Sequence, residues 1–192
     1  MKIWAKLDSP HFVQYKSAWN EQCDERTLHQ YKTKVKVPDD LVINSNCFVL
    51  YFQMDLCWFD LNFALNECRK YFNVGDKQLF PRLGYYILSE LLLEIVECIG
   101  FLHESNPKII HRDIKPANFL IKAHGRDGRF VKLADFGLAV THETDSQSHT
   151  TNAGTRRYMA PEVSNGRKYK WRADLYSLGV MIQEMFNIDI NK

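Results

Sequence analysis

The chain has 192 residues, of which 45% are apolar and 25% are charged, a composition typical of a folded globular protein. It excludes a disordered tail, a collagen-like fibre and a low-complexity linker. Lys and Arg number 25 against 23 Asp and Glu, so the formal net charge is only +2 and gives no reason to propose a nucleic-acid partner.

The cysteines and the most apolar segment indicate the compartment. None of the five cysteines forms a C-x-x-C pair, which favours free thiols over a zinc site or a disulfide framework. The N-terminus lacks the long apolar core of a signal peptide. Residues 87–102 are the most apolar helical stretch, but Glu90, Glu94 and Glu97 interrupt it, so we predict no membrane segment. We expect a cytoplasmic protein, with a nuclear location as the alternative.

The first half of the chain predicts two strands followed by two helices. Residues 11–19 alternate apolar and polar side chains, as a strand does, and residues 20–46 form a polar loop or insertion. Residues 47–54 are β-branched and aromatic, which predicts a buried strand. Helices are predicted over 61–72 and 82–104. The second helix places these apolar side chains on one face: Leu88, Leu91, Leu92, Ile95, Ile99 and Leu102.

The second half of the chain predicts short strands, a polar loop and one further helix. Residues 109–140 contain short apolar runs cut by Asp, Asn, Pro and Gly, which predicts short strands and loops. Residues 141–153 are polar and predict an exposed, mobile loop. Residues 172–187 are mostly apolar and predict a largely buried helix.

Three short motifs carry the chemistry of this chain: HRDIKPAN at 111–118, DFG at 135–137 and APE at 160–162. Their order and spacing resemble those of a eukaryotic protein kinase. The resemblance implies the α+β, two-lobed protein-kinase-like fold in truncated form, with the end of the small lobe and the first part of the helical large lobe. It makes residues 1–57 the remnant of the small lobe and hinge, and residues 58–192 a partial large lobe.

The resemblance assigns roles to four polar residues of these motifs. Asp113 accepts or orients the proton of the attacking hydroxyl. Lys115 neutralises charge on the transferred phosphoryl group. Asn118 and Asp135 are hard oxygen ligands for Mg²⁺, which holds the phosphates of ATP. Alone, an Asp-x-Lys pair would be a surface ion pair and an Asn would be a turn residue, but the whole constellation favours the catalytic interpretation.

Residues near the catalytic loop indicate the substrate class and a mode of regulation. By resemblance, Lys115 and Thr155 are typical of serine/threonine enzymes, in which the Thr hydroxyl bonds the catalytic Asp and Lys. The alternative is that Thr155 only caps a turn. Arg112 is either an ordinary surface residue or, by resemblance, the receptor for a phosphate on Thr150 or Thr151, which could order the loop through charge-assisted hydrogen bonds.

Three further residues have structural roles by resemblance. Asp174 holds the backbone of the His111–Arg112 turn, and otherwise it is an acidic residue in a first helical turn, where the macrodipole favours it. Glu162 pairs, in the family, with an Arg further along than the last residue of this chain. Tyr158 is interpreted as a packing residue.

The nucleotide-binding hinge is assigned by resemblance alone. Met54 resembles the gatekeeper, and the segment from Asp55 to Cys57 resembles the hinge whose backbone binds adenine. As plain structure, the same residues are a central strand and its turn. The SAW string at 17–19, the polar insertion and the FQMDLC string at 52–57 resemble the kinases of the α subunit of translation initiation factor 2, although Wee-type kinases share the SAW feature.

The Gly-rich loop and the strand Lys of the kinase signature do not occur in the sequence, whose first glycine is Gly75. We therefore expect a chain that begins partway through a small lobe and stops before the closing helices, as part of a longer kinase or as a real short product. We expect the 192 residues alone to have little activity and poor solubility. One apolar face of the last helix would lack partners: Leu178, Val180, Met181, Ile182, Met185 and Phe186.

Two functions of different classes follow from these observations. The leading hypothesis is a serine/threonine protein kinase that transfers the γ-phosphoryl group of ATP to a protein hydroxyl, with the α subunit of translation initiation factor 2 as one candidate substrate. The alternative is a non-catalytic, pseudokinase-like binding or regulatory module. A protein substrate and Mg–ATP are the expected partners of the enzyme, and dimerisation of a longer parent stays open.

Overall fold

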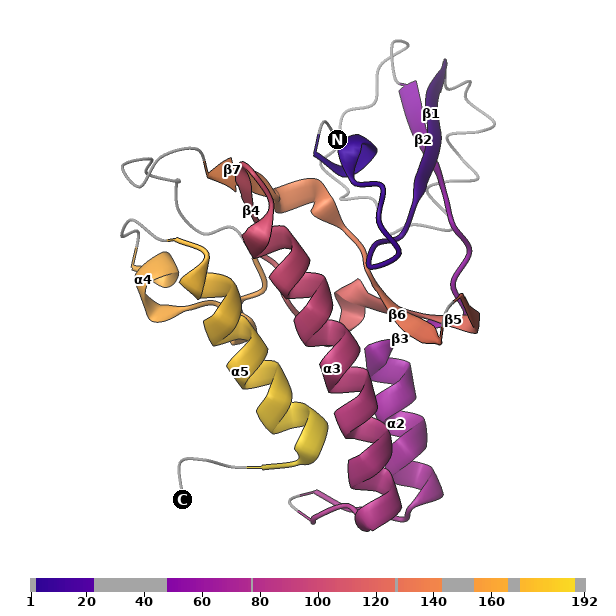
Figure 1. Cartoon of the computed structure of the whole chain (residues 1–192), viewed down its shortest axis with the longest axis vertical. Helices are drawn as coiled ribbons and strands as arrows, with labels where there is room; N and C mark the ends of the chain where they lie inside the picture. The colour runs from indigo at the N-terminus through magenta and orange to yellow at the C-terminus, as the bar shows by residue number, and fades with distance from the viewer. Residues whose placement is uncertain are drawn as a thin grey trace, which may run out of the picture. The chain divides into compact units, whose positions relative to one another are not determined.

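A computed structural model describes residues 3–22, 48–76, 78–126, 128–142, 154–165 and 170–188. The chain divides into two compact units (Figure 1). The smaller unit is residues 15–55, and the larger one joins residues 1–14 to residues 56–192. The predicted division of the chain at residue 57 into two lobes stays a prediction, and most of the predicted insertion at 20–46 lies outside the described residues.

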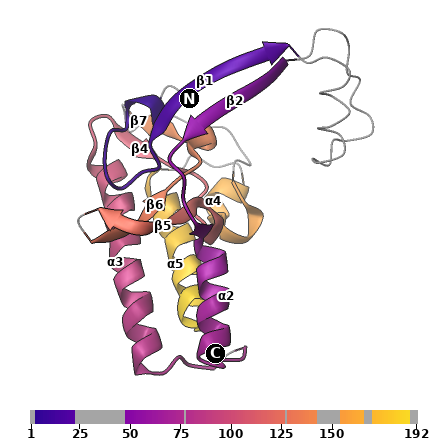
Figure 2. The same ribbon diagram turned by 90° about the vertical axis from the view of Figure 1, so that its right-hand side faces the viewer.

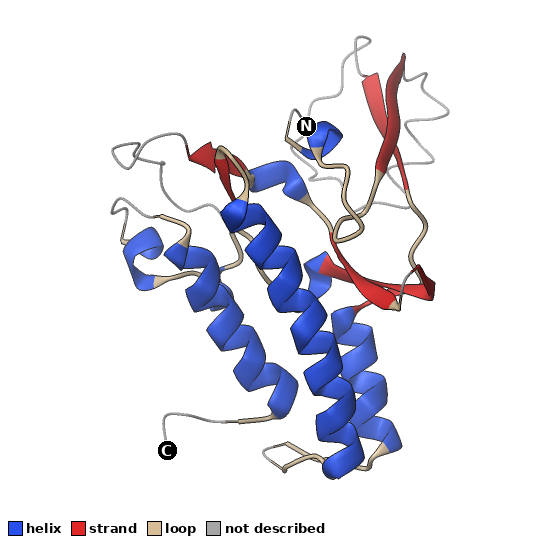
Figure 3. Cartoon of the chain, in the orientation of Figure 1, coloured by secondary structure: helices blue, strands red, loops and turns tan. Residues whose placement is uncertain are grey.

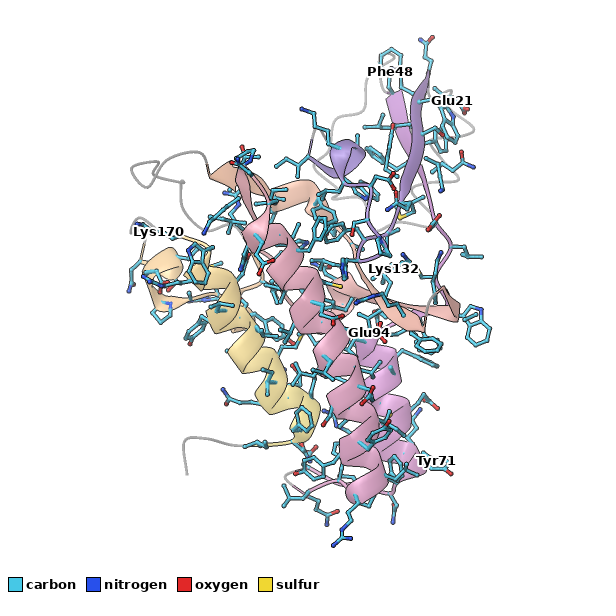
Figure 4. All side chains as sticks on the ribbon, viewed as in Figure 1. Glu21, Phe48, Tyr71, Glu94, Lys132 and Lys170 are labelled. Carbon is cyan, nitrogen blue, oxygen red and sulfur yellow. The ribbon has the colours of Figure 1, made fainter. Side chains whose placement is uncertain are left out.

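The described part of the smaller unit is an antiparallel ribbon of β1 (Tyr15–Gln22) and β2 (Phe48–Met54). Trp19 stacks on Tyr51 across the two strands, with ring centroids 5.3 Å apart. Figure 4 labels Glu21 and Phe48 at one end of the ribbon, where the last residues of β1 pair with the first of β2. Cross-strand aromatic pairs of this kind stabilise a two-stranded ribbon, and the Ser17 hydroxyl also donates to the Gln53 side chain across the strands at 2.9 Å.

Two strand predictions need correction. Residues 11–13 pair with Leu133 of the larger unit, and only from Tyr15 does the chain join β2. The cause is that Phe12 and Val13 are consecutive and both fully buried, which an alternating strand does not allow. The strand at 47–54 forms but is not buried, because no described element covers its apolar face: Phe48, Leu50, Phe52 and Met54 are 39 to 61% exposed.

The sheet of the larger unit contains β3 (Phe59–Asp60), β5 (Phe119–Arg126) and β6 (Arg129–Leu133), paired antiparallel in that order. A separate pair is formed by β4 (Lys108–Ile110) and β7 (Val140–His142). These are the short strands predicted for residues 109–140. The predicted loop at 141–153 has its first two residues in β7, and the rest lies outside the described residues.

Three long helices form the body of the larger unit and run alongside one another (Figures 2 and 3). They are α2 (Leu61–Tyr71), α3 (Arg82–Glu104) and α5 (Arg172–Phe186), and α4 (Pro161–Ser164) is a single short turn. The helices begin and end close to where the sequence predicts. Asp60 caps α2, since its carboxylate accepts a hydrogen bond of 2.9 Å from the backbone N–H of Phe63.

The core of the larger unit lies between α3 and its neighbours. The face of α3 that the sequence predicts is buried at Leu88, Ile95, Ile99 and Leu102, and its remaining members pack at the edge of the core. On the side toward β6, the Glu94 carboxylate accepts hydrogen bonds of 2.8 Å from two backbone N–H groups of that strand (Figure 4). None of the described helices is long and apolar enough to cross a membrane.

The expectation that one face of α5 lacks partners is wrong for the described structure. Leu178, Met181, Met185 and Phe186 are less than 10% exposed, and the other two residues of that face are partly buried against the same core. Tyr85 of α3 stacks on Phe186 with ring centroids 5.7 Å apart. The apolar face of α5 therefore gives no reason to expect poor solubility, because α3 and its neighbours already cover this face.

Candidate active site

Strand β4 leads into the first motif, which begins with a turn. The side chain of Asp174 on α5 accepts hydrogen bonds from the backbone of this turn. Asp174 is 1% exposed, and its two carboxylate oxygens accept hydrogen bonds of 2.9 Å from the backbone N–H groups of His111 and Arg112. Its Oδ2 also lies 2.9 Å from Nε2 of His103 on α3. Arg112 adopts a left-handed φ of 69°. The carboxylate thus stabilises a backbone conformation that non-glycine residues seldom take.

The Asp113 carboxylate lies at the centre of a hydrogen-bonded cluster. Its Oδ1 accepts from the backbone N–H of Thr155 at 2.9 Å and from the Thr155 hydroxyl at 2.8 Å. Its Oδ2 accepts from Lys115 Nζ at 2.6 Å and from Asn118 Nδ2 at 3.1 Å. Lys115 also donates to the Thr155 hydroxyl at 2.8 Å. The contact of Thr155 with both residues, which the resemblance implies, is therefore present.

The charge state of Asp113 follows from this cluster. Burial would raise the pKa of its carboxyl, but the hydrogen bonds from Lys115, Thr155 and Asn118 outweigh burial and hold the pKa below its ordinary value. Asp113 is therefore ionised at neutral pH. A carboxylate offers about four lone-pair positions, and four donors already occupy them. An incoming hydroxyl must replace one of these donors, and Asn118 makes the longest of the four bonds.

Asn118 and Asp135 are brought together by the β5–β6 ladder. The ladder pairs Phe119 with Leu133, and beyond it the N–H of Ala134 donates to the Asn118 carbonyl at 2.8 Å. Asp135 comes next, in a left-handed conformation with an exposed side chain. Two segments more than a dozen residues apart thus place an amide and a carboxylate at one edge of the sheet.

These two side chains fit a magnesium site. Asn118 is 5% exposed and uses Nδ2 to donate to Asp113, while no donor among the described residues reaches its Oδ1. No group of three or more His, Cys, Asp or Glu side chains in the described part of the chain could hold a metal alone. Mg²⁺ commonly takes only one or two protein oxygens and completes its shell with water and phosphate. A buried acceptor oxygen beside an exposed carboxylate is such a partial set.

Aromatic rings fix the DFG segment, a feature that no pattern in the sequence predicted. Phe136 is 3% exposed and meets Phe12 and His111 edge to face, at centroid distances of 5.4 and 5.2 Å, and Trp4 at 6.4 Å. His111 is fully buried with Nε2 3.0 Å from the Ala134 carbonyl, and burial lowers the pKa of its imidazole. Local spacing could not have revealed these contacts, since Trp4 and Phe136 are far apart in the chain.

Tyr158 does more than pack. It is 8% exposed, and its hydroxyl donates to the Glu184 carboxylate of α5 at 2.6 Å. Burial, together with this carboxylate, raises the pKa of Tyr158. The same oxygen of Glu184 lies 3.7 Å from the Arg157 guanidinium. The segment after Thr155 is therefore tied to α5, a tie that the prediction of a packing residue left out.

The remaining predicted residues differ in how much the structure says of them. Arg112 is half-buried and its Nε donates to the Leu138 carbonyl. The phosphate acceptors proposed for it, Thr150 and Thr151, lie outside the described residues. Glu162 is half-buried on α4, and no described residue pairs with its carboxylate. The regulatory and structural roles of these residues stay predictions.

The predicted hinge residues are divided between the two units. Met54 ends β2 and is 43% exposed, and Asp55 forms an ion pair of 3.2 Å with Lys16 inside the smaller unit. Cys57 is half-buried in the larger unit. Their adenine-binding role stays a prediction.

Comparison with known proteins agrees with this fold. Residues 1–190 match the family described as the protein kinase domain, and the chain belongs to that family. The chain is 42% identical over 115 residues to human cyclin-dependent kinase-like 2, an alignment that covers 59% of this chain and 22% of that protein. It is 33% identical over 150 residues to mouse eukaryotic translation initiation factor 2-alpha kinase 1, covering 72% of this chain and 23% of that protein.

A third relative, from another organism, has a similar identity. The chain is 44% identical over 89 residues to the ankyrin repeat-containing protein kinase A of Dictyostelium discoideum, which covers 45% of this chain and 6% of that protein. In each case the alignment spans less than a quarter of the relative's length. The predicted protein-kinase-like α+β fold is thereby confirmed.

Proposed function

We propose that this chain is the catalytic segment of a serine/threonine protein kinase, which transfers the γ-phosphoryl group of ATP to a protein hydroxyl. The observation that carries the proposal is the cluster in which Lys115 and Thr155 both bond the Asp113 carboxylate. A reaction with a loose transition state needs positioning and charge neutralisation more than covalent chemistry. The cluster supplies both within one buried set of contacts.

Asp113 orients the attacking hydroxyl. Because its pKa is lowered, its carboxylate is a weak base at neutral pH and takes the proton only late, as the bond to phosphorus forms. Asp113 first accepts a hydrogen bond from the substrate hydroxyl, in place of the one from Asn118. This contact turns a lone pair of the hydroxyl oxygen toward the phosphorus. Lys115, at 2.6 Å from Asp113, can then place its ammonium charge near the transferred group without a large movement.

ATP and Mg²⁺ are the cofactors that this proposal requires. Mg²⁺ would be held by Asn118 and Asp135, and it supplies neutralisation of the phosphate charge. The protein's own part is to keep the Asn118 acceptor oxygen free and to hold the Asp135 backbone beside it. The aromatic packing around Phe136 serves this second purpose, because it fixes the residue that follows Asp135.

The hydroxyl of Thr155 is the observation that favours Ser or Thr over Tyr as the acceptor. It bonds both Asp113 and Lys115, a contact that the resemblance to serine/threonine enzymes implies. The α subunit of translation initiation factor 2 is one candidate substrate. The reason is that 72% of this chain aligns with a relative that is named as a kinase of that subunit. The identity to human cyclin-dependent kinase-like 2 is higher, at 42% over a shorter stretch of 115 residues, so the identity of the acceptor protein is the least supported part of the proposal.

Two substitutions test the catalytic roles. Asp113→Asn and Asp135→Ala should each abolish transfer of radiolabelled γ-phosphate while leaving the circular dichroism spectrum unchanged, because one replaces the basic carboxylate by a neutral amide that cannot take up the proton and the other removes a metal ligand. Loss of a positioned general base alone costs about 10²–10⁴-fold. The assay uses the 192-residue chain and any longer protein that contains it, with Ser, Thr and Tyr peptides as acceptors. Transfer at near wild-type rate in either variant would contradict the assigned role.

A non-catalytic, pseudokinase-like module is the second candidate. The observation that favours it is that four donors of this chain already occupy the lone-pair positions of the Asp113 carboxylate, so no position on it is open to a substrate hydroxyl. Calorimetric titration with ATP, with and without Mg²⁺, separates the two functions. Binding of nucleotide with no transfer to any peptide supports the module, and Mg²⁺-dependent binding with transfer supports the enzyme.

A further inference from the structure

The segment that follows Thr155 presents two adjacent arginines, Arg156 and Arg157, on the surface beside the candidate catalytic carboxylate. We infer that these arginines select substrates that carry an anionic side chain, Asp, Glu or phosphorylated Ser, within about three residues of the phosphoacceptor. The inference deepens the proposed function and rests on it, since it presumes that the acceptor hydroxyl reaches Asp113.

The position of the turn brings both arginines close to the catalytic carboxylate. The backbone N–H and the hydroxyl of Thr155 both bond Asp113, so the backbone of this segment lies directly against that carboxylate. Arg156 and Arg157 are the next two residues, in the single helical turn η4 (Arg156–Tyr158). Consecutive Cα atoms are about 3.8 Å apart. A peptide whose hydroxyl sits at Asp113 therefore has its neighbouring residues within reach of both guanidinium groups.

The turn carries an excess of positive charge. Arg156 is exposed and has no carboxylate within 4.0 Å among the described residues. Arg157 has a side chain that is 68% exposed, and its nearest carboxylate is that of Glu184 at 3.7 Å. That carboxylate also accepts the Tyr158 hydroxyl at 2.6 Å, so it neutralises Arg157 only in part. Of the two guanidinium groups, only that of Arg157 has a described carboxylate nearby, and that carboxylate is shared with Tyr158.

A cavity beside the turn contains a further arginine. The cavity, of about 450 Å³, is lined by two arginines, Arg157 and Arg69 of α2, and by two carboxylates, Asp76 and Glu184. Arg69 donates to the Glu184 backbone carbonyl at 2.7 Å and to the Asn66 side chain, and no described carboxylate pairs with it. The charged groups of the cavity balance, so the excess of positive charge lies on the exposed turn itself.

The Arg157 guanidinium is supported on one side by an aromatic ring. It lies over the Tyr158 ring with its central carbon 5.9 Å from the centroid, and Tyr158 is itself fixed to Glu184. A guanidinium presents its N–H donors as a planar fork, which suits two-point binding of a carboxylate or a phosphate. Arg156 adds a second exposed guanidinium to the same turn.

The test measures binding first, apart from catalysis. Fluorescently labelled Ser peptides that differ only in Asp, phosphoserine or Asn at the flanking positions, on either side of the Ser, are titrated with the full chain and followed by anisotropy. An exposed ion pair contributes up to about fivefold in affinity, so the two arginines should favour the acidic peptides by about 5- to 25-fold. Raising the ionic strength to about 1 M should remove the preference, because the Debye length falls to about 3 Å.

Matched variants distinguish this turn from a general charge effect. Arg156→Gln with Arg157→Gln should abolish the preference, and Arg82→Gln should keep it, because Arg82 is an exposed arginine at the start of α3. Equal affinity for acidic and Asn peptides, equal loss in the Arg82→Gln variant, or no measurable binding of the acidic peptides would each overturn the inference.

A parallel transfer assay separates failure of the inference from failure of the proposed function. Transfer to acidic and Asn peptides with equal efficiency overturns the charge preference and leaves the kinase assignment standing. Preferential binding of acidic peptides that are never phosphorylated supports the anion site and removes the catalytic proposal.

Discussion

Replacing Asp174 by Ala removes the carboxylate that holds the backbone of the His111–Arg112 turn in place. The side chain is 1% exposed and makes three contacts of 2.9 Å, to the backbone N–H groups of His111 and Arg112 and to Nε2 of His103. Alanine leaves these donors without an acceptor in a buried position. It also removes what keeps Arg112 in its left-handed conformation.

The expected loss can be worked from these contacts. A hydrogen bond to a charged group contributes about 1.5–3 kcal/mol, and breaking a buried charged contact by removing one partner costs about 3–5 kcal/mol. The three contacts share one side chain and do not add fully. We therefore expect Asp174→Ala to lower the free energy of unfolding by about 4–6 kcal/mol, against a total of about 5–15 kcal/mol for a typical domain.

Urea unfolding followed by circular dichroism measures this loss. Glu162→Ala is the control, since Glu162 is also an acidic residue in the first turn of a helix but has no described partner, and it should change stability by no more than about 0.5 kcal/mol. Asp174→Asn keeps one accepting oxygen and should fall between the two, which keeps the test decisive if the alanine variant does not fold. A loss below about 1 kcal/mol in Asp174→Ala would refute the reasoning.

Three other substitutions test separate parts of the site. Gly154→Ala should lower both stability and phosphoryl transfer, because its Cβ would lie 2.5 Å from the Arg112 carbonyl at a φ of +116°; a wild-type melting curve would contradict this. Tyr158→Phe should lower the free energy of unfolding by about 1.5–3 kcal/mol through its lost bond to Glu184, as measured in urea. Burial lowers the pKa of His111 from 6.5, so the unfolded state takes up the proton first and stability should fall as pH decreases below about 6.5; His111→Phe should flatten that slope.

Local sequence determined the elements and the chemistry of the larger unit. The apolar spacing of residues 82–104 places one face of α3 in the core because a helix repeats every 3.6 residues, and that period is visible in the sequence. The candidate catalytic residues are equally local, since Asp113, Lys115 and Asn118 lie on one loop. The resemblance of that short segment to the protein kinase signature was therefore sufficient to propose them.

Only the tertiary structure determined which helices and strands pack against one another. The β2 composition predicts a strand, but burial depends on a covering element, and β2 is exposed in the described structure. Likewise, α5 has its apolar face covered by α3, although the sequence alone suggested that this face lacked partners. The ties of Phe136 to Trp4 and of Tyr158 to Glu184 join residues far apart in the chain. Such contacts follow from how the helices and strands pack, and no periodicity along the sequence records them.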